Sequence, residues 1–283
     1  MFEILSGILI AVGGGIGLYV WQRKVLERIF VKRIKSSSDK HVDGLLRLYE
    51  RLFPEEDGTN YTIEEINEFM DARPEAERHV AVENVALVAI LKEEVVGFIL
   101  CSLYPLKRRK AIVTYFAVDE DNDEARLKSA GDRLLERLKT ILIKSKKCDA
   151  LFYELQAPDE RDSVPERRKR RARRLLFRRK AKASGLKALE FQFPYQCAKV
   201  SLSSDVHESP FSLFCIGLRE AIPNQVSKKQ LLEYLEFIYL DCYGDLYPKD
   251  DPRFSEHQAH LIGMLEHYKK TLPEVVLAEE KRI

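Results

Sequence analysis

The feature that most constrains this chain is an uncharged stretch close to its N-terminus, residues 4–21, with the sequence ILSGILIAVGGGIGLYVW. As an α-helix it would be about 27 Å long, close to the hydrocarbon thickness of a bilayer. Basic residues follow it, at Arg23, Lys24, Arg28, Lys32, Arg33 and Lys35. Because basic flanks stay in the cytoplasm, we expect residues 1–28 to be a single-pass transmembrane anchor, with the N-terminus outside and the rest of the chain cytoplasmic.

Two other interpretations of this stretch are less consistent with its residues. A cleaved signal peptide carries basic residues before its apolar run, whereas here the only charged residue before the run is Glu3. A buried core helix would have to include four glycines within residues 13–17, and glycine is a poor helix former in water. Gly13 and Gly17 also have the spacing of helix pairs in membranes, so a homodimer is a further expectation.

Strand and helix patterns alternate through residues 29–219. Apolar residues make up 45% of the chain, enough for a packed core, and the net charge of +2 identifies no class of partner. Five cysteines without a Cys-x-x-Cys pair are typical of a reducing compartment. The patterns predict strands at 30–37, 79–91, 95–104, 111–118, 149–155, 185–191 and 210–218.

Helical patterns separate several of these strands. They begin at residue 42, at the capping box TIEE (62–65), after the acidic loop that follows the 111–118 strand, and after a charged insertion beyond residue 155. Helices between strands require crossover connections, which predicts an α/β fold: a mixed, partly parallel sheet flanked by helices. Residues 227–270 predict two more helices, so residues 220–283 are expected to form a C-terminal helical extension.

At residues 115–135, YFAVDEDNDEARLKSAGDRLL, a strand, a loop and a helix follow one another. This stretch resembles the GNAT superfamily, the acyl-CoA-dependent N-acyltransferases, whose helix opens with Arg/Gln-x-x-Gly-x-Gly/Ala. Here Arg126-Leu-Lys-Ser129-Ala-Gly131 takes that place. LFYEL (151–155) and FRRKAKASGLKAL (177–189) resemble two further family segments. The resemblance covers about residues 29–219 and implies transfer of an acyl group, in particular acetyl, from acyl-CoA to an amine on a small molecule or a protein.

The resemblance also implies where coenzyme A binds. Its pyrophosphate would contact backbone amides at the helix start, where N–H groups lack intrahelical partners and the helix dipole favours anions. Its pantetheine arm would pair with the backbone of Phe116 and Val118. The implied cofactor-binding residues are therefore Phe116, Val118, Arg126, Lys128, Ser129, Ala130, Gly131 and Asp132.

Two features depart from the family pattern. The family often has a tyrosine, serving as general acid to the thiolate, four residues before the Gly185 position, and Ala181 stands there. The acidic loop at 119–124 would repel a polyanion unless it is shielded. A non-catalytic GNAT-fold module that binds a ligand or partner at the membrane is therefore the alternative to an enzyme.

Acyl transfer to an amine needs a base for the ammonium proton and a proton donor for the thiolate. Glu154, on the strand beside the cofactor strand, is the candidate base, and Tyr115 and Tyr153 are candidate donors. Tyr195 and Gln196 lie where the resemblance places the substrate mouth. Each of these residues is also compatible with a packing, ion-paired or turn role. We expect no metal, because His257, His260 and His267 lack a further converging ligand.

The segment 167–182, RRKRRARRLLFRRKAK, contains eleven basic residues out of sixteen. Three roles remain open for it. It would attract anionic lipid head groups, which suits a chain tethered to the inner leaflet. It would bind nucleic acid through phosphates, although no base-reading aromatic residues are interleaved. Alternatively, it is a solvated arm paired with nearby carboxylates or a seat for the 3′-phosphate of the cofactor.

Overall fold

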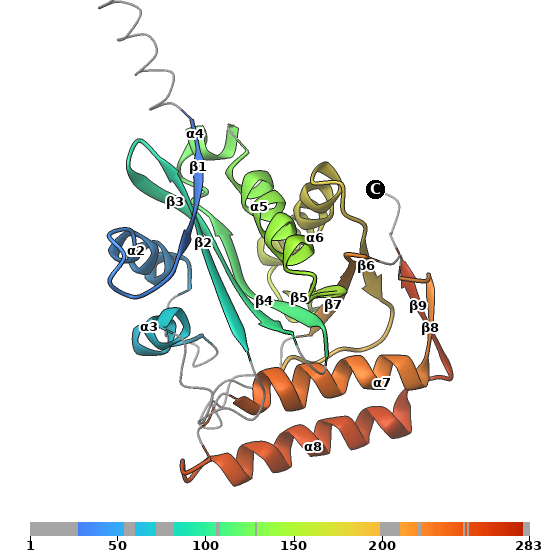
Figure 1. Ribbon diagram of the computed structural model, residues 1–283. Helices are drawn as coiled ribbons and strands as arrows, with labels where there is room; N and C mark the ends of the chain where they lie inside the picture. Colours follow the sequence, from blue (N-terminus) through green and yellow to red (C-terminus); the bar gives the residue numbers. More distant parts are fainter. Residues whose placement is uncertain are drawn as a thin grey trace, which may run out of the picture.

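The computed structural model places a mixed β-sheet between layers of helices (Figure 1). It describes residues 28–53, 60–71, 82–105, 108–127, 129–198, 210–219, 222–245, 247 and 249–279, with Arg126, Leu127 and Asp245 described by their backbone only. The expected anchor segment therefore lies outside the described residues, apart from Arg28. None of the helices within these ranges is both long enough and apolar enough to span a bilayer.

The N-terminal half forms one antiparallel side of the sheet. Its strands are paired in the order β1-β2-β3-β4. The predicted capping box is present, since Thr62 Oγ1 accepts from the N–H of Glu65 and a Glu65 oxygen accepts from the N–H of Thr62. The elements are β1 (Phe30–Ile34), α2 (Val42–Leu52), α3 (Ile63–Asp71), β2 (Glu83–Leu91), β3 (Glu94–Tyr104) and β4 (Lys110–Val118).

The second half supplies the parallel crossover and confirms the predicted mixed sheet. Strand β5 pairs parallel with β4 on one side and antiparallel with β7 on the other, and β7 pairs with β6. The elements are α4 (Asp123–Leu127), α5 (Ala130–Ser145), β5 (Ala150–Gln156), α6 (Val164–Ala183), β6 (Ala188–Phe191) and β7 (Phe211–Gly217).

The C-terminal extension contains the two expected helices and also continues the sheet. Strand β9 pairs with β6, and β8 pairs with β9. Between the helices, the chain passes through a π-helix at Phe237–Cys242 and a 3₁₀ turn at Tyr243–Asp245. The other elements are β8 (Gln225–Ser227), α7 (Lys228–Glu236), α8 (Phe254–Thr271) and β9 (Val275–Glu279). The two strands add to the predicted helical extension, while its boundary at residue 220 stays a prediction.

Each face of the sheet has its own helices and its own buried cluster. On one face, Leu134, Leu138 and Leu142 of α5 are buried against β2 and β3 together with Phe177 of α6. On the other face, α2 and α3 cover the first strands, and α7, α8 and the π-helix cover β5, β6 and β7. Figure 1 shows the two helix layers on opposite sides of the sheet. The extension therefore shares a core with the strands that carry the candidate site.

Candidate functional site

Strands β4 and β5 separate in the middle of the sheet. Their ladder has four pairs, from Lys110–Ala150 to Val113–Tyr153. Beyond it, β4 continues to Val118 while paired with β3, and β5 continues to Gln156 while paired with β7. Within the described part of the chain, the two strands thus stop pairing with each other while both remain in the sheet. Their facing backbone groups are placed to hydrogen-bond an extended ligand in the manner of an added strand.

A β-bulge in β4 lies at the point of separation. Val113 and Tyr115 pair with consecutive residues of β3, so Thr114 is the extra residue. As a result, Ile112 and Tyr115 both face the layer of α2, α3 and α7, whereas Val113 and Phe116 face α5. Tyr115 and Phe116 therefore have their side chains on opposite faces of the sheet.

Aromatic side chains fill the α6 side of the separating strands. The ring centroids of Phe116 and Tyr153 are 6.4 Å apart, and those of Tyr153 and Phe177 are 4.4 Å apart. Burial raises the pKa of Tyr153, and the nearby Arg173 partly offsets this. Tyr153 faces away from Glu154, so the two predicted catalytic side chains of β5 do not meet. The geometry favours the packing role of Tyr153.

The predicted pyrophosphate turn forms the N-terminus of α5. Ser129 is the N-cap and has left-handed backbone angles, φ 58° and ψ 44°, with no side-chain cap bond among the described residues. The Arg126 backbone lies in α4, and Lys128 lies outside the described residues. Ala130 and Gly131 are buried at the helix start. The left-handed conformation explains why glycine is the commoner residue at position 129 in the family pattern that this stretch resembles.

A cation from α6 covers this helix start. A Cβ atom on Gly131 would lie 3.0 Å from Cδ and Cε of Lys180, and Lys180 Nζ is 3.1 Å from Asp132 Oδ1. Gly131 thus makes room for the Lys180 side chain, which is a structural reason for glycine in addition to the predicted functional one. The sequence groups Lys180 with the other basic residues of 167–182 but does not single it out, because its contact with Gly131 depends on how α6 packs against α5.

Glu154 lies on the opposite face at the centre of a polar cluster. The Tyr195 hydroxyl donates to Glu154 Oε1, and the Tyr243 hydroxyl donates to Glu154 Oε2 at 2.7 Å. Cys197 Sγ is 2.8 Å from the Tyr243 hydroxyl oxygen. These residues come from β5, from the segment after β6 and from the 3₁₀ turn of the extension. Both carboxylate oxygens are therefore held by hydroxyl donors.

The environment of this cluster favours neutral side chains. Burial raises the pKa of the Glu154 carboxyl, and the hydrogen bonds from Tyr195 and Tyr243 partly oppose the increase. Burial also raises the pKa values of Tyr195, Tyr243 and the Cys197 thiol. A carboxylate with a raised pKa that remains hydrogen-bonded is well suited to accept a proton from an ammonium group.

Helices of the extension fix the segment that carries Tyr195 and Gln196. The rings of Tyr195, Tyr239 and Tyr268 stack in sequence, with 6.1 Å between each pair of centroids. The Tyr239 hydroxyl donates to the Gln196 carbonyl at 2.6 Å, and the Gln196 N–H donates to the Tyr268 hydroxyl at 2.9 Å. Tyr195 thus joins the cluster, whereas Gln196 contributes its backbone and exposes its side chain.

Tyr115 faces the same side of the sheet as Glu154 but comes from the other separating strand. Its hydroxyl accepts from the backbone N–H of Tyr61 at 2.9 Å, and its ring packs edge-on against Tyr49. Burial raises the pKa of Tyr115 to about 12, with additions from Glu65 and Cys197. The hydroxyl stays protonated at neutral pH and retains a proton that it is able to donate.

His257 of α8 packs against the 3₁₀ turn that carries Tyr243. Its side chain is fully buried, its Nε2 lies 2.9 Å from the Tyr243 carbonyl oxygen, and its ring packs against Tyr247. Burial lowers the pKa of His257, so the neutral Nε2–H form donates to that carbonyl. Across the parts of the chain that the structure describes, no group of three His, Cys, Asp or Glu side chains is placed to hold a metal ion.

Sequence comparisons find no matching family model and no matching curated protein. Structural comparison finds solved acetyltransferases. An aminoglycoside 6′-N-acetyltransferase complexed with coenzyme A has a TM-score of 0.46 and 16% identity, over 69% of this chain and 99% of that chain. The aminoglycoside 6′-N-acetyltransferase from Enterococcus faecium has a TM-score of 0.44 at the same identity and coverage. The ribosomal-protein-S18-alanine N-acetyltransferase from Escherichia coli has a TM-score of 0.42 and 13% identity, over 69% and 97%.

Proposed function

We propose that this protein is an acyl-CoA-dependent N-acyltransferase that transfers an acyl group, in particular acetyl, to an amine acceptor. The observation that carries the proposal is the separation of β4 and β5 beyond Val113 and Tyr153. On one side of the separating strands lies the start of α5, and on the other lies the carboxylate of Glu154 with its hydroxyl donors. An extended acyl carrier between the strands would thus have a phosphate-binding helix start on one face and a base on the other.

The residues around α5 fit coenzyme A as a co-substrate. The β4 backbone at Phe116 and Val118 would pair with the pantetheine amides, and the α5 start would bind the pyrophosphate. Lys180, beside Gly131, would add a cation to that site. The acidic loop is partly neutralised, since Arg51 contacts Asp119 at 2.7 Å and Lys92 contacts Glu124 at 2.8 Å. These two cations reduce the repulsion between the loop and a polyanionic co-substrate.

Glu154 is the base in this proposal. It takes a proton from the acceptor ammonium group, so that the free amine attacks the thioester carbonyl, the C–N bond forms and the C–S bond breaks. Tyr195 and Tyr243 hold the two carboxylate oxygens in place. Tyr115 donates its proton to the departing thiolate, in the role that the family often gives to a tyrosine at the Ala181 position, and regains the second proton that the newly acylated nitrogen releases. Ala181 itself is fully buried and provides no proton donor.

The direct test compares the Glu154→Gln variant with the parent in an acetyl-CoA thiol-release assay across a panel of amines. Glutamine retains the size and accepts one hydroxyl hydrogen bond, so the variant is expected to bind coenzyme A as the parent does. Without the base, turnover should fall by a factor of about 10² or more. Full turnover of this variant would contradict the role of Glu154, and a lack of coenzyme A binding by the parent would contradict the whole proposal.

Tethering to a membrane through residues 1–28, with the catalytic domain in the cytoplasm, is part of the proposal and is supported by the uncharged run at 4–21 and the basic residues after it. Resistance of the full chain to alkaline extraction from membranes tests the proposed tether.

The alternative function is a non-catalytic module of the same shape. It is favoured by Ala181, which is fully buried and stands where the family pattern often has a tyrosine acid. Coenzyme A binding without turnover would support that alternative.

A further inference from the structure

Basic side chains on one side of helix α6 form ion pairs with the rest of the fold. Arg174 and Arg178 both pair with Glu190, which is buried on β6. Arg170 contacts Asp162 at 3.3 Å, and Lys180 contacts Asp132 at 3.1 Å. The buried Glu190 needs cationic partners, and each of the four partly buried cations is paired with a carboxylate. Four of the eleven basic residues at 167–182 are therefore explained by the fold itself.

The opposite side of α6 carries the cations that the fold does not use. These side chains are exposed, and none of them forms an ion pair within the described part of the chain. Exposed like charges that lie close together repel one another and do not stabilise the fold. Binding of an anionic partner relieves this repulsion. Five of them point away from the sheet: Arg168, Lys169, Arg171, Arg179 and Lys182. Arg173 is also exposed but lies on the flank of the attached side, three residues from Arg170 and four from the buried Phe177.

Large aliphatic side chains lie exposed on the same helix. Leu176 is 50% exposed and Val164 is 52% exposed. Leu176 is three residues from Arg173 and three from Arg179, so it shares a helix surface with cations. Exposed leucine among basic residues is typical of helices that lie in a membrane interface, whereas single-stranded nucleic acid is usually bound by exposed aromatic rings. The aromatic residue of α6, Phe177, is buried against Tyr153.

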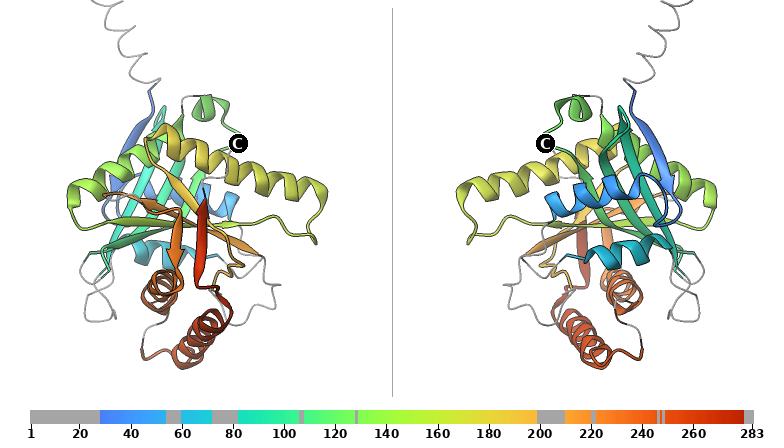
Figure 2. Two further views of the ribbon diagram at one scale, coloured as in Figure 1. Left: turned by 90° about the vertical axis from the view of Figure 1, so that its right-hand side faces the viewer. Right: turned by 90° about the vertical axis from the view of Figure 1, so that its left-hand side faces the viewer.

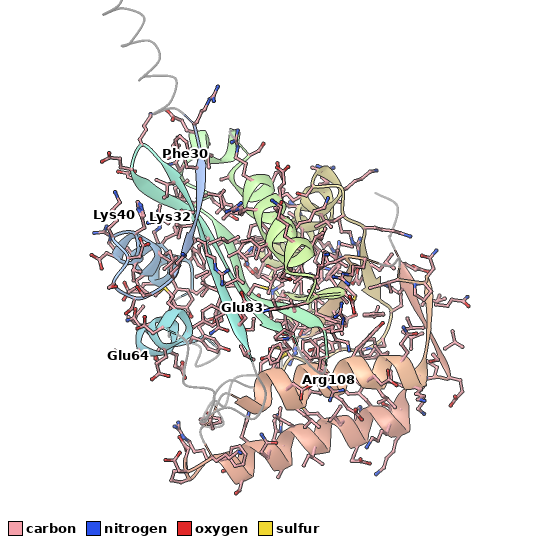
Figure 3. The ribbon with its side chains drawn as sticks, in the orientation of Figure 1. Phe30, Lys32, Lys40, Glu64, Glu83 and Arg108 are labelled. Atoms are coloured by element: carbon pink, nitrogen blue, oxygen red, sulfur yellow. The ribbon has the colours of Figure 1, made fainter. Side chains whose placement is uncertain are left out.

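We propose that the outward face of α6 docks on an anionic lipid surface, with its five exposed cations at the head groups and Leu176 at the interface. A helix of 20 residues offers a contact about 30 Å long. In Figures 2 and 3, α6 and the start of β1 at Phe30 both lie in the part of the molecule away from α8. The uncharged run at 4–21 precedes β1 in the sequence, so this end is also the one nearest a tether.

This contact is separate from the proposed chemistry. Glu154 faces the layer of α7, α8 and the π-helix, on the side of the sheet opposite α6. A membrane against the outward face of α6 would thus leave the acceptor side open to water. The docking proposal therefore does not depend on acyl transfer, and its test measures lipid contact alone.

The test uses the full-length chain with Leu176→Cys carrying an environment-sensitive fluorophore, reconstituted into nanodiscs. Discs of phosphatidylcholine alone are compared with discs that contain about one third phosphatidylglycerol. The label should shift its emission to shorter wavelength and become shielded from the neutral quencher acrylamide in the anionic discs. Salt at about 0.5 M should reverse both effects. The parent protein, which lacks Cys at position 176, is treated with the same fluorophore as a control. Its signal measures background labelling of the five native cysteines.

Two charge-matched variants isolate the contribution of α6. The first changes Arg168, Lys169, Arg171, Arg179 and Lys182 to Gln, and each lost cation should weaken the contact about fivefold, so that the anionic shift disappears. The second removes five exposed cations elsewhere, at Lys144, Lys146, Lys229, Lys249 and Lys270, and should retain the shift. Glutamine is a good helix former, and circular dichroism checks that α6 survives.

Three results would overturn the proposal. The label could respond equally in both kinds of disc, the first variant could keep the shift, or both variants could lose it. Displacement of the label from anionic discs by a trace of single-stranded RNA would instead identify nucleic acid as the preferred ligand. Failure of acyl transfer with an intact fluorescence shift would leave the docking surface standing and contradict only the proposed enzyme.

Discussion

Replacing Tyr243 by Phe removes one hydrogen-bond donor from the candidate base and leaves the ring in place. The Tyr243 hydroxyl donates to Glu154 Oε2 at 2.7 Å. A hydrogen bond to a charged group contributes about 1.5–3 kcal/mol, and here it stabilises the ionised carboxylate against burial. Its loss should raise the pKa of Glu154 further. The acidic limb of the kcat/KM profile should then move to higher pH, because the base must be deprotonated to act.

The expected size of this effect follows from the same hydrogen bond. On the acidic side of the profile, kcat/KM should fall by about tenfold to a hundredfold, and at alkaline pH the variant and the parent should converge. Stopped-flow or plate assays of thiol release across pH provide the profile. Tyr234→Phe is the matched control, because that hydroxyl accepts from Gln230 and does not contact Glu154. An unshifted acidic limb in Tyr243→Phe, or an equal shift in the control, would refute the reasoning.

Three further changes test the fold around the site. Ser129→Gly should preserve or raise the melting temperature, because the left-handed backbone at this position suits glycine; a lower value in calorimetry would contradict the assigned conformation. Glu190→Gln should destabilise the protein by about 3–5 kcal/mol in urea unfolding, since it leaves two arginines without a carboxylate; a change under 1 kcal/mol would mean that water replaces the pair. Burial lowers the pKa of His257 below its ordinary 6.5, so the unfolded chain takes up that proton first and stability should fall as pH drops below about 6.5. His257→Gln should flatten this dependence, and an identical pH profile in the variant would exclude the histidine.

Local patterns predict most of the sheet but not its far edge. The alternation of strand and helix signals at 30–218 gives the observed order apart from the short helix α4, which lies where the sequence predicts a loop. Strands β8 and β9 have three and five residues and are stabilised by pairing with each other and with β6, so their local signals are weak. A short strand that depends on a distant partner carries little information in its own sequence.

Some residues of the candidate site are likewise predicted from the sequence, and others depend on contacts with distant segments. The sequence predicts Glu154 as a base on the strand beside the cofactor strand, and the family resemblance places Tyr195 at the substrate mouth; in the structure the two side chains meet. Tyr243 and Cys197 were not identified, because the contact between them joins residues 46 positions apart through the π-helix of the extension. Aromatic residues recur through residues 234–243, but nothing in the sequence distinguishes the packing role of Tyr239 from the polar role of Tyr243.

Arg108 illustrates how the extension is fixed to the strands that separate. Its guanidinium pairs with Asp241 of the π-helix, and Figure 3 labels it beside α7. Lys110, the first residue of β4, places its ammonium group over the rings of Tyr234 and Phe237. These contacts attach the start of β4 to α7 and to the π-helix that directly precedes Tyr243. Such long-range electrostatic contacts appear only when the sheet has formed, so single-sequence patterns do not predict them.

The measurement that tests the central claim most directly is calorimetric titration of the full-length protein with acetyl-CoA, beside Gly131→Val and Gly263→Val. The parent should bind with a Kd below about 1 mM. Gly131→Val should bind at least about tenfold more weakly, because its side chain would displace Lys180 and hold the phosphates away from the amides of the α5 start. Gly263 lies in open space on α8, so Gly263→Val should bind as the parent does. Absence of binding heat for the parent at millimolar acetyl-CoA, or equal affinity in Gly131→Val, would contradict the account.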